Sequence, residues 1–368
     1  MSADISSVFD RKNNLAKKQG SSSEESFSWI QAWNDFWFTP QQPYTICLMR
    51  LFTGCLIAYI TFTYSYDLLA FVGPDGLLDK IAMDELRKDN PIFVTPPNWF
   101  DNPKELDKAV YIWSPYIHLT STNCIWAIHI GILLANICMA LGLFTRASTI
   151  LSWMGAMFYV QRCSSSLFGM DAMIMILLFY MMLAPGWQAY SLDSLIIKYF
   201  KRKAGDKNWN APPEPLISTN VVIRMVQVHF CIIYMAAATS KLQGAAWWNG
   251  TALWGVLANY SFNPMHIPAY TALITFLAKH RLLWEILMTT GCVFTIILES
   301  SFPFLVWHKN TRWLMISGSV LLHFGIAILM GLIVFSLCMM TLVLSFVPAE
   351  TSKSFVERWI LRKPLENS

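Results

Sequence analysis

Hydrophobic residues gather along the chain in long runs that are separated by shorter polar segments. A helix needs about 20 apolar residues to cross the hydrocarbon core of a bilayer. The runs that approach or exceed this length are Tyr44–Phe71, Asn123–Phe144, Ser148–Val160, Leu167–Pro185, Val221–Ser240, Leu282–Phe304 and Trp313–Val347. This pattern predicts an all-α protein, a polytopic transmembrane helical bundle.

The number of spans depends on two of these runs. Ser148–Val160 is short for a span, although Trp153 and Tyr159 extend it toward the membrane interface. Trp313–Val347 would measure about 52 Å as one helix, which is too long for one upright span and tight for two. It predicts either two short helices that separate near Gly331 or one strongly tilted helix. We therefore expect about seven or eight spans.

The segments outside the spans divide the chain further. Gly244–Pro268 is rich in Trp and interrupted by Gly250 and Pro264, which predicts an interfacial or re-entrant element at the outer surface. Residues 1–28 are polar and mixed in charge, which predicts a disordered cytoplasmic tail. A transmembrane domain over residues 29–348 follows, and residues 349–368 form a short basic tail.

Composition supports a membrane protein and disfavours two other classes. The 368 residues are 55% hydrophobic and only 14% charged, whereas soluble domains carry about 25% charged residues. The net charge of +4 is spread out, so no basic stripe indicates a nucleic-acid partner. The eight Cys residues lie singly, without zinc-type spacing, so we expect neither a metal site nor a disulfide framework.

Orientation follows from basic residues, which favour the cytoplasmic side of a membrane. Arg146, the basic residues within 198–203, Lys309 and Arg312 fall on one side if the helices alternate, and the acidic loop 73–118 falls on the other. We therefore expect an integral membrane protein whose N-terminus is cytoplasmic and whose partners include membrane lipid.

Lys241 is the most informative charged residue. A charge inside a span costs at least about 2.5–3.5 kcal/mol and often marks function. Arg50 lies close enough to a helix end to reach the interface. Lys241 closes the apolar run Cys231–Ser240 on the side where positive charge is least expected. It either reaches the interface in the same way, or lies in a dry pocket where its neutral form can act as a base.

Other ionisable residues inside the spans also have two interpretations. His323 is the only acid or base within Trp313–Phe346, and a buried imidazole needs hydrogen-bond partners whether its role is structural or functional. Glu299 either pairs internally or takes part in chemistry. Arg162 and Asp171 bracket a short turn, where they form either an ion pair between two helix ends or a ligand site.

Short motifs along the chain resemble the HTTM (horizontally transferred transmembrane) domain, which many bacterial proteins share with vitamin K-dependent γ-glutamyl carboxylase. They occur in family order across about residues 30–348. These motifs are Arg50–Gly54, Gly73–Leu78, Thr145–Trp153, Gly169–Asp171, Leu183–Pro185, Ser191–Asp193, Gln227–Tyr234, Ser240–Leu242, Trp247–Leu253, Glu299–Pro303 and His323–Ala327.

The resemblance implies a membrane enzyme that uses a reduced isoprenoid quinone as cofactor, in a bacterial inner membrane. It implies that Lys241 corresponds to the carboxylase's membrane-embedded lysine base, and that His323 corresponds to a histidine on a late span. The remaining residues of the substrate and cofactor pocket would be Arg162, Asp171, Arg224, Gln227, Tyr234, Trp248 and Glu299.

The chain also departs from the carboxylase pattern. The histidine that precedes a Leu-aromatic-Gly step is absent, because Ser164 and Ser165 occupy its place, and Asn249 replaces an acid. These differences favour a compact bacterial member, akin to a membrane protein needed for maturation of a secreted peptide toxin. Two functions stay open: a quinone-dependent oxidoreductase or carboxylase-like lyase, and a non-catalytic protein for maturation of, export of or immunity to a secreted peptide. A transporter is disfavoured because no internal repeats are visible.

Overall fold

A computed structural model describes residues 28–79, 81–83, 113–163 and 166–360. Chain contacts divide the protein into two units, residues 1–39 and 40–368. The first unit contains α2 (Trp29–Phe38), whose N-terminus is capped by the hydroxyl of Ser28. The predicted disordered tail therefore lies outside the described residues except for Ser28.

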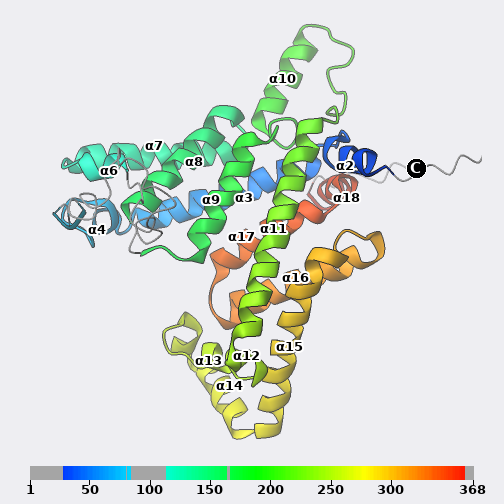
Figure 1. Ribbon diagram of the computed structural model, residues 1–368. Helices are drawn as coiled ribbons and strands as arrows, with labels where there is room; N and C mark the ends of the chain where they lie inside the picture. Colours follow the sequence, from blue (N-terminus) through cyan, green and yellow to red (C-terminus); the bar gives the residue numbers. More distant parts are fainter. Residues whose placement is uncertain (1–27, 80, 84–112, 164–165, 361–368) are drawn as a thin grey trace, which may run out of the picture. The chain divides into compact units, whose positions relative to one another are not determined.

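The second unit is helical, and Figure 1 shows its long helices. Among the described residues no strand occurs, and the only β-type pairing is an isolated bridge between Gln41 and Leu216. Five helices are long and apolar enough to cross a membrane: α3 (Tyr44–Tyr64), α7 (Thr122–Leu141), α11 (Ile217–Gln243), α15 (Arg281–Leu305) and α16 (Lys309–Leu329). The prediction of an all-α membrane bundle is confirmed.

The other predicted spans are helical but differ in length and composition. α9 (Gly169–Leu183) is apolar and shorter than a usual span, and α8 (Thr145–Arg162) carries polar residues at both ends. A bent pair counts as a sixth span if it is taken as one: Ile333–Phe346, which includes α17 (Ile333–Val343), and Ala349–Trp359 meet at 119°. Length and composition thus support five or six spans, fewer than the seven or eight expected, with α8 and α9 as the additional predicted segments.

Gly331 separates α16 from α17, as one of the two sequence interpretations predicted. Its φ is +71°, a left-handed conformation that glycine adopts without steric cost. A Cβ at this position would lie 3.0 Å from Pro264, so the close approach also favours glycine. The long apolar stretch is therefore two helices, separated by residues 330–332 with Gly331 in the left-handed conformation.

The remaining elements are short. The Trp-rich segment is broken, as predicted, and the basic tail begins as helix before the description ends at residue 360. These elements are α4 (Leu68–Val72), α6 (Pro115–His118), α10 (Leu192–Lys203), α12 (Ala245–Trp248), α13 (Ala252–Leu257), η3 (Asn263–His266), α14 (Pro268–Lys279), η4 (Leu344–Phe346), α18 (Ala349–Phe355) and η5 (Val356–Ile360).

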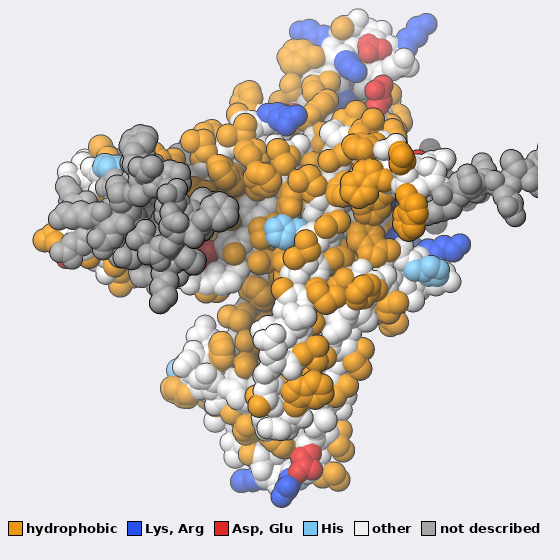
Figure 2. Space-filling view, viewed as in Figure 1, with side chains coloured by type: hydrophobic (Ala, Val, Ile, Leu, Met, Phe, Trp, Pro, Cys, Tyr) orange, Lys and Arg blue, Asp and Glu red, His pale blue; other side chains and the backbone are white. Residues whose placement is uncertain are grey.

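Much of the apolar surface of the helices faces outward. Hydrophobic side chains cover large parts of the face shown in Figure 2. In α16 only 22% of the most apolar 18-residue window is buried inside the protein, and in α15 only 28%. A soluble protein rarely exposes contiguous apolar patches of this kind. These surfaces identify an integral membrane protein whose outer solvent is lipid.

Arg50 joins α3 to two other segments. Its guanidinium is fully buried and donates hydrogen bonds to the carbonyl oxygens of Met139 and Ala140 at the end of α7, and to that of Tyr190. The expectation that Arg50 reaches the interface is therefore wrong. The last carbonyls of a helix lack partners within the helix, and Arg50 supplies them here.

Candidate functional site

Polar residues recur at intervals of seven along α11. Gln227, Tyr234 and Lys241 lie on one face of this helix because seven residues correspond to about two turns. Gln227 and Tyr234 are buried, and apolar residues such as Phe230 surround them. The three side chains contact η4, α16 and α15 in turn, so the repeat places a row of polar groups between α11 and its neighbours.

Lys241 forms an ion pair with Glu299 of α15. Its Nζ lies 3.0 Å from Oε1 and 2.8 Å from Oε2 of the carboxylate. The Glu299 side chain is 8% exposed and that of Lys241 is 21% exposed. Nζ also lies 5.3 Å from the centroid of the Trp247 ring, within range of a cation–π contact. Of the two interpretations of Glu299, the structure therefore contains the internal pair.

Tyr234 joins α11 to α16. Its hydroxyl hydrogen-bonds to the hydroxyl of Ser319 and lies 2.9 Å from Nε2 of His323. Ser319 and His323 are four residues apart, so they lie on the same face of α16. Phe302 packs at 4.9 Å from the Tyr234 ring, and Phe335 at 6.0 Å from the His323 ring. The polar groups thus meet inside an aromatic shell.

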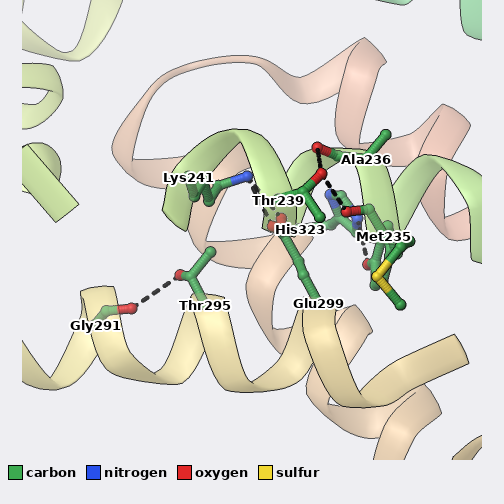
Figure 3. Close-up of polar contacts among 9 residues, drawn as sticks. Met235, Ala236, Thr239, Lys241, Gly291, Thr295, Glu299 and His323 are labelled. Atoms are coloured by element: carbon green, nitrogen blue, oxygen red, sulfur yellow. Dashed lines mark hydrogen bonds and ion pairs between the residues drawn. The ribbon is translucent and has the colours of Figure 1, made fainter. Parts of the chain in front are cut away.

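His323 has one ring nitrogen without a partner. Its Nδ1 is buried and makes no hydrogen bond within the described part of the chain. Buried polar atoms are nearly always hydrogen-bonded, and an exception requires an explanation such as a water molecule or a ligand. Figure 3 shows Lys241 and Glu299 pointing toward one another between α11 and α15, with His323 beside them.

The Lys241–Glu299 pair and the Tyr234–His323 pair both contain groups that can transfer protons. A lysine and a carboxylate in contact can share one proton, and an imidazole can donate or accept one. A free amine was the functional interpretation of Lys241, but its amine lies against the Glu299 carboxylate. A lysine acts as a base only as a neutral amine, and Glu299 is the carboxylate in contact with it.

Arg224 and Gln227 lie far from Lys241 along the same helix. Arg224 precedes Lys241 by 17 residues, which corresponds to about 25 Å of helix. Arg224 donates to Oε1 of Gln227 at 3.0 Å, and the Gln227 amide donates to the Ser345 carbonyl at 2.8 Å. The structure therefore places these two predicted pocket residues in a separate cluster near the start of α11.

Arg162 and Asp171 belong to α8 and α9. Arg162 donates to the carbonyls of Gly73 and Leu78, at 2.6 Å each. Asp171 accepts from the Phe168 backbone N–H at 2.9 Å and so caps α9. In the described part of the chain no ion pair joins Arg162 to Asp171, so the predicted clamp is wrong: each side chain instead satisfies backbone groups. Ser164 and Ser165 lie outside the described residues.

Trp248 is exposed rather than part of the Lys241 cluster. Its side chain is 69% exposed, and its indole N–H donates to the Leu242 carbonyl at 2.7 Å. The preceding residue, Trp247, makes the contact with Lys241. The sequence motif selected Trp248, whereas the turn after α11 places the Trp247 indole beside the amine.

Two features of the structure were missed by sequence reasoning. Ser319 was not selected, although its spacing of four from His323 placed it on the same helix face. The partners of His129, in a second buried network apart from this site, were also missed: its Nδ1 contacts Tyr159 at 2.5 Å and its Nε2 contacts Ser65 at 2.7 Å. A lone serine or tyrosine in an apolar run carries no signal that distinguishes it from an ordinary core residue.

The described residues contain no metal-binding cluster, and comparisons with known proteins give no further information on this site. Among the described residues, no group of three or more His, Cys, Asp or Glu side chains could hold a metal ion. Comparisons with protein-family models, curated proteins and solved structures found no match to this chain. The chain is an integral membrane protein in which a partly buried Lys241–Glu299 pair lies beside a buried Tyr234–His323–Ser319 cluster.

Proposed function

We propose that this chain is an HTTM-type membrane enzyme that couples oxidation of a reduced isoprenoid quinone to modification of a peptide or small substrate. The observation that carries this proposal is the partly buried Lys241–Glu299 pair beside the Tyr234–His323 hydrogen bond. Ionisable groups inside a membrane protein are costly, and they commonly mark functional sites. The motif resemblance supports the identity of the cofactor class.

The residues present fit such a group. The unpartnered Nδ1 of His323 needs a polar partner, and a quinone oxygen would provide one. An apolar cavity of about 540 Å³ lies between α3 and α17, lined by Phe52, Tyr59 and Leu337 among others. Such a cavity suits an isoprenoid chain, and α17 also carries Phe335, which packs against His323. When bound, a reduced quinone would supply two phenolic protons and two electrons, with molecular oxygen as the oxidant.

The chain's own residues would manage one of those protons. Glu299 would take the ammonium proton, and the resulting Lys241 amine would accept a phenolic proton as general base. His323 would orient the ring through Nδ1 while Tyr234 holds Nε2 in place, since the partner of one nitrogen sets the role of the other. The aromatic shell would exclude water, which strengthens each of these interactions.

Location and orientation belong to the same proposal. The resemblance supports a bacterial inner membrane, and the distribution of basic residues supports a cytoplasmic N-terminus. Quinone and lipid would be partners in that membrane, and a secreted peptide would be the substrate or client.

A second candidate is a non-catalytic role in the maturation of, export of or immunity to a secreted peptide. Trp248, with 69% of its side chain exposed, favours this alternative. Exposed Trp is typical of binding hot spots, and the ion pair would then serve only to fix the end of α11 against α15. The two candidates differ in whether Lys241 must lose its proton.

Quinone extraction from purified variants separates the two candidates. We would compare wild type with Lys241→Ala, Lys241→Arg and the exposed control Lys279→Arg, and measure co-purifying quinones and quinone epoxide by mass spectrometry after reduction and aeration. The enzyme proposal predicts bound quinone in all four, with epoxide only in wild type and the control, because arginine stays protonated. Epoxide formation by Lys241→Arg, or no quinone in any variant, would reject it in favour of the binding role.

A further inference from the structure

α10 is amphipathic, and the residues of its apolar side are exposed. Leu192, Leu195, Ile196, Tyr199 and Phe200 follow the i, i+3, i+4, i+7, i+8 spacing of one helix face. All five are exposed, Leu195 at 61% and Phe200 at 60%, and no residue of α10 is buried. An amphipathic helix of this kind commonly lies in the plane of the membrane interface.

The opposite side and the C-terminal end of α10 are basic. Lys198 and Lys201 lie across the helix from the apolar face, and Arg202 and Lys203 complete the last turn. The only acid in the helix is Asp193, which accepts hydrogen bonds from the backbone N–H groups of Phe144 and Thr145 and from the Thr145 hydroxyl. The charge of the basic residues is therefore not compensated within α10.

The described partners of these cations are neutral. The Lys198 Nζ lies 3.2 Å from Oδ1 of Asn210, and the Arg202 guanidinium lies 5.2 Å from the centroid of the Trp209 ring. Both partners come from the loop that follows α10. The loop also carries Asp206 and Glu214, but among the described residues neither acid forms an ion pair with Lys198 or Arg202, which leaves these cations available to an anion.

A cavity of about 930 Å³ adjoins this helix and has two chemically different walls. Leu51, Leu141 and Leu195 form apolar parts of its lining, and Leu195 belongs to the exposed apolar face of α10. Lys198 and Lys353 belong to the polar part, together with Asn210 and Glu357. Lys353 comes from α18, 155 residues after Lys198, and its Nζ lies 5.5 Å from the centroid of the Tyr44 ring.

We infer that this cavity binds the headgroup of an anionic phospholipid while α10 lies in the headgroup layer beside it. Two lysines and one glutamate on the polar wall leave a net positive charge for the phosphate. The leucine wall is continuous with the lipid-facing side of α10, so it suits the glycerol and the first acyl carbons. An anionic phospholipid combines a charged phosphate with apolar acyl chains, so it matches both walls of the cavity. The inference does not depend on the proposed redox chemistry.

The test uses the full-length protein in nanodiscs of phosphatidylcholine with or without phosphatidylglycerol. Bound phosphatidylglycerol per protein is counted by native mass spectrometry, and the thermal midpoint is measured in both lipids. The variants are Lys198→Gln/Lys353→Gln, the charge-preserving Lys198→Arg/Lys353→Arg, and Lys309→Gln as a basic-to-neutral control outside the cavity. A basic residue near an anionic membrane surface contributes about fivefold in affinity, so two contribute about 30-fold.

We expect wild type, the arginine variant and Lys309→Gln to retain phosphatidylglycerol and to gain thermal stability from it. The double glutamine variant should bind it about 30-fold more weakly, while its midpoint in pure phosphatidylcholine matches wild type and shows that it folds. Equal retention in the double glutamine variant would overturn the inference. So would an equal loss in Lys309→Gln, because the attraction would then be a general effect of surface charge.

Discussion

Replacing Lys241 with alanine would leave the Glu299 carboxylate without its partner inside the bundle. The Glu299 side chain is 8% exposed, and in the described part of the chain its carboxylate contacts the Lys241 amine. Breaking a buried ion pair by removing one partner typically costs about 3–5 kcal/mol, because the remaining charge is desolvated and unpaired. We therefore expect Lys241→Ala to lower the free energy of unfolding by about 3 kcal/mol or more.

The reverse substitution should cost less. Glu299→Ala leaves an amine that is 21% exposed and that keeps its contact with the Trp247 ring. A lysine at the end of a span can extend its flexible side chain toward the interface. We expect a loss of about 1–3 kcal/mol, the range for an unsatisfied polar group. The asymmetry follows from the difference in exposure of the two side chains.

The double variant Lys241→Ala/Glu299→Ala completes a thermodynamic cycle. With both charges removed, no unpaired ion remains, so its loss should be smaller than the sum of the two single losses by about 1–3 kcal/mol. Unfolding free energies would be measured for all four proteins in mixed micelles with increasing denaturing detergent. Lys279→Ala, at the C-terminal end of α14, provides a control for the loss of an exposed lysine.

Additivity would refute this reasoning. If the double variant lost the sum of the single losses within about 0.5 kcal/mol, Lys241 and Glu299 would not interact in the folded protein. Equal losses of unfolding free energy in the two single variants would be compatible with the ion pair. They would contradict the expectation that the less exposed Glu299 loses more when its partner is removed.

Three further substitutions test other parts of the fold, each by the thermal midpoint in detergent. Gly54→Ala should lower the thermal midpoint, because the added Cβ would lie 2.5 Å from the α7 backbone. Gly131→Ala is the control, since its Cβ would have no atom within 4 Å; its stability should stay the same or rise by up to about 1 kcal/mol. Arg50→Lys should cost about 3 kcal/mol, since one ammonium cannot reproduce the fork of donors to separate carbonyls; an unchanged midpoint would contradict this. Tyr234→Phe should cost about 1–3 kcal/mol by leaving the His323 Nε2 without its hydroxyl partner, and a loss that persists in a His323→Leu background would argue against the hydrogen bond as its cause.

Helix type and approximate helix bounds were predictable from sequence because they depend on local apolar runs. The break between α16 and α17 at Gly331 was also predictable, since one stretch was too long for a single upright span and contained a residue free to adopt positive φ. The count of spans was less predictable. α8 and α9 begin where side chains accept hydrogen bonds from their first backbone N–H groups, as Asp193 and Asp171 do. A hydropathy pattern contains no information about these contacts.

For the candidate site, sequence reasoning identified the costly residues but not their partners. Lys241, Glu299 and His323 stood out because charged and titratable groups are rare in apolar runs. Arg162 and Asp171 stood out for the same reason, yet the structure assigns them to backbone hydrogen bonds. A charged residue in a span must be compensated by another polar or charged group. The sequence does not show whether that group is a backbone carbonyl, a backbone N–H or an opposite charge.

The sequence by itself therefore determined the class of protein, its helical segments and the few residues whose burial needs compensation. These properties follow from composition and from spacing along a single helix. The tertiary structure alone decided that Lys241 meets Glu299 across 58 residues and that Tyr234 meets His323 across 89. Such pairings depend on how separate helices rotate and pack against one another, and many packings bury the same apolar area, so no local pattern can select among them.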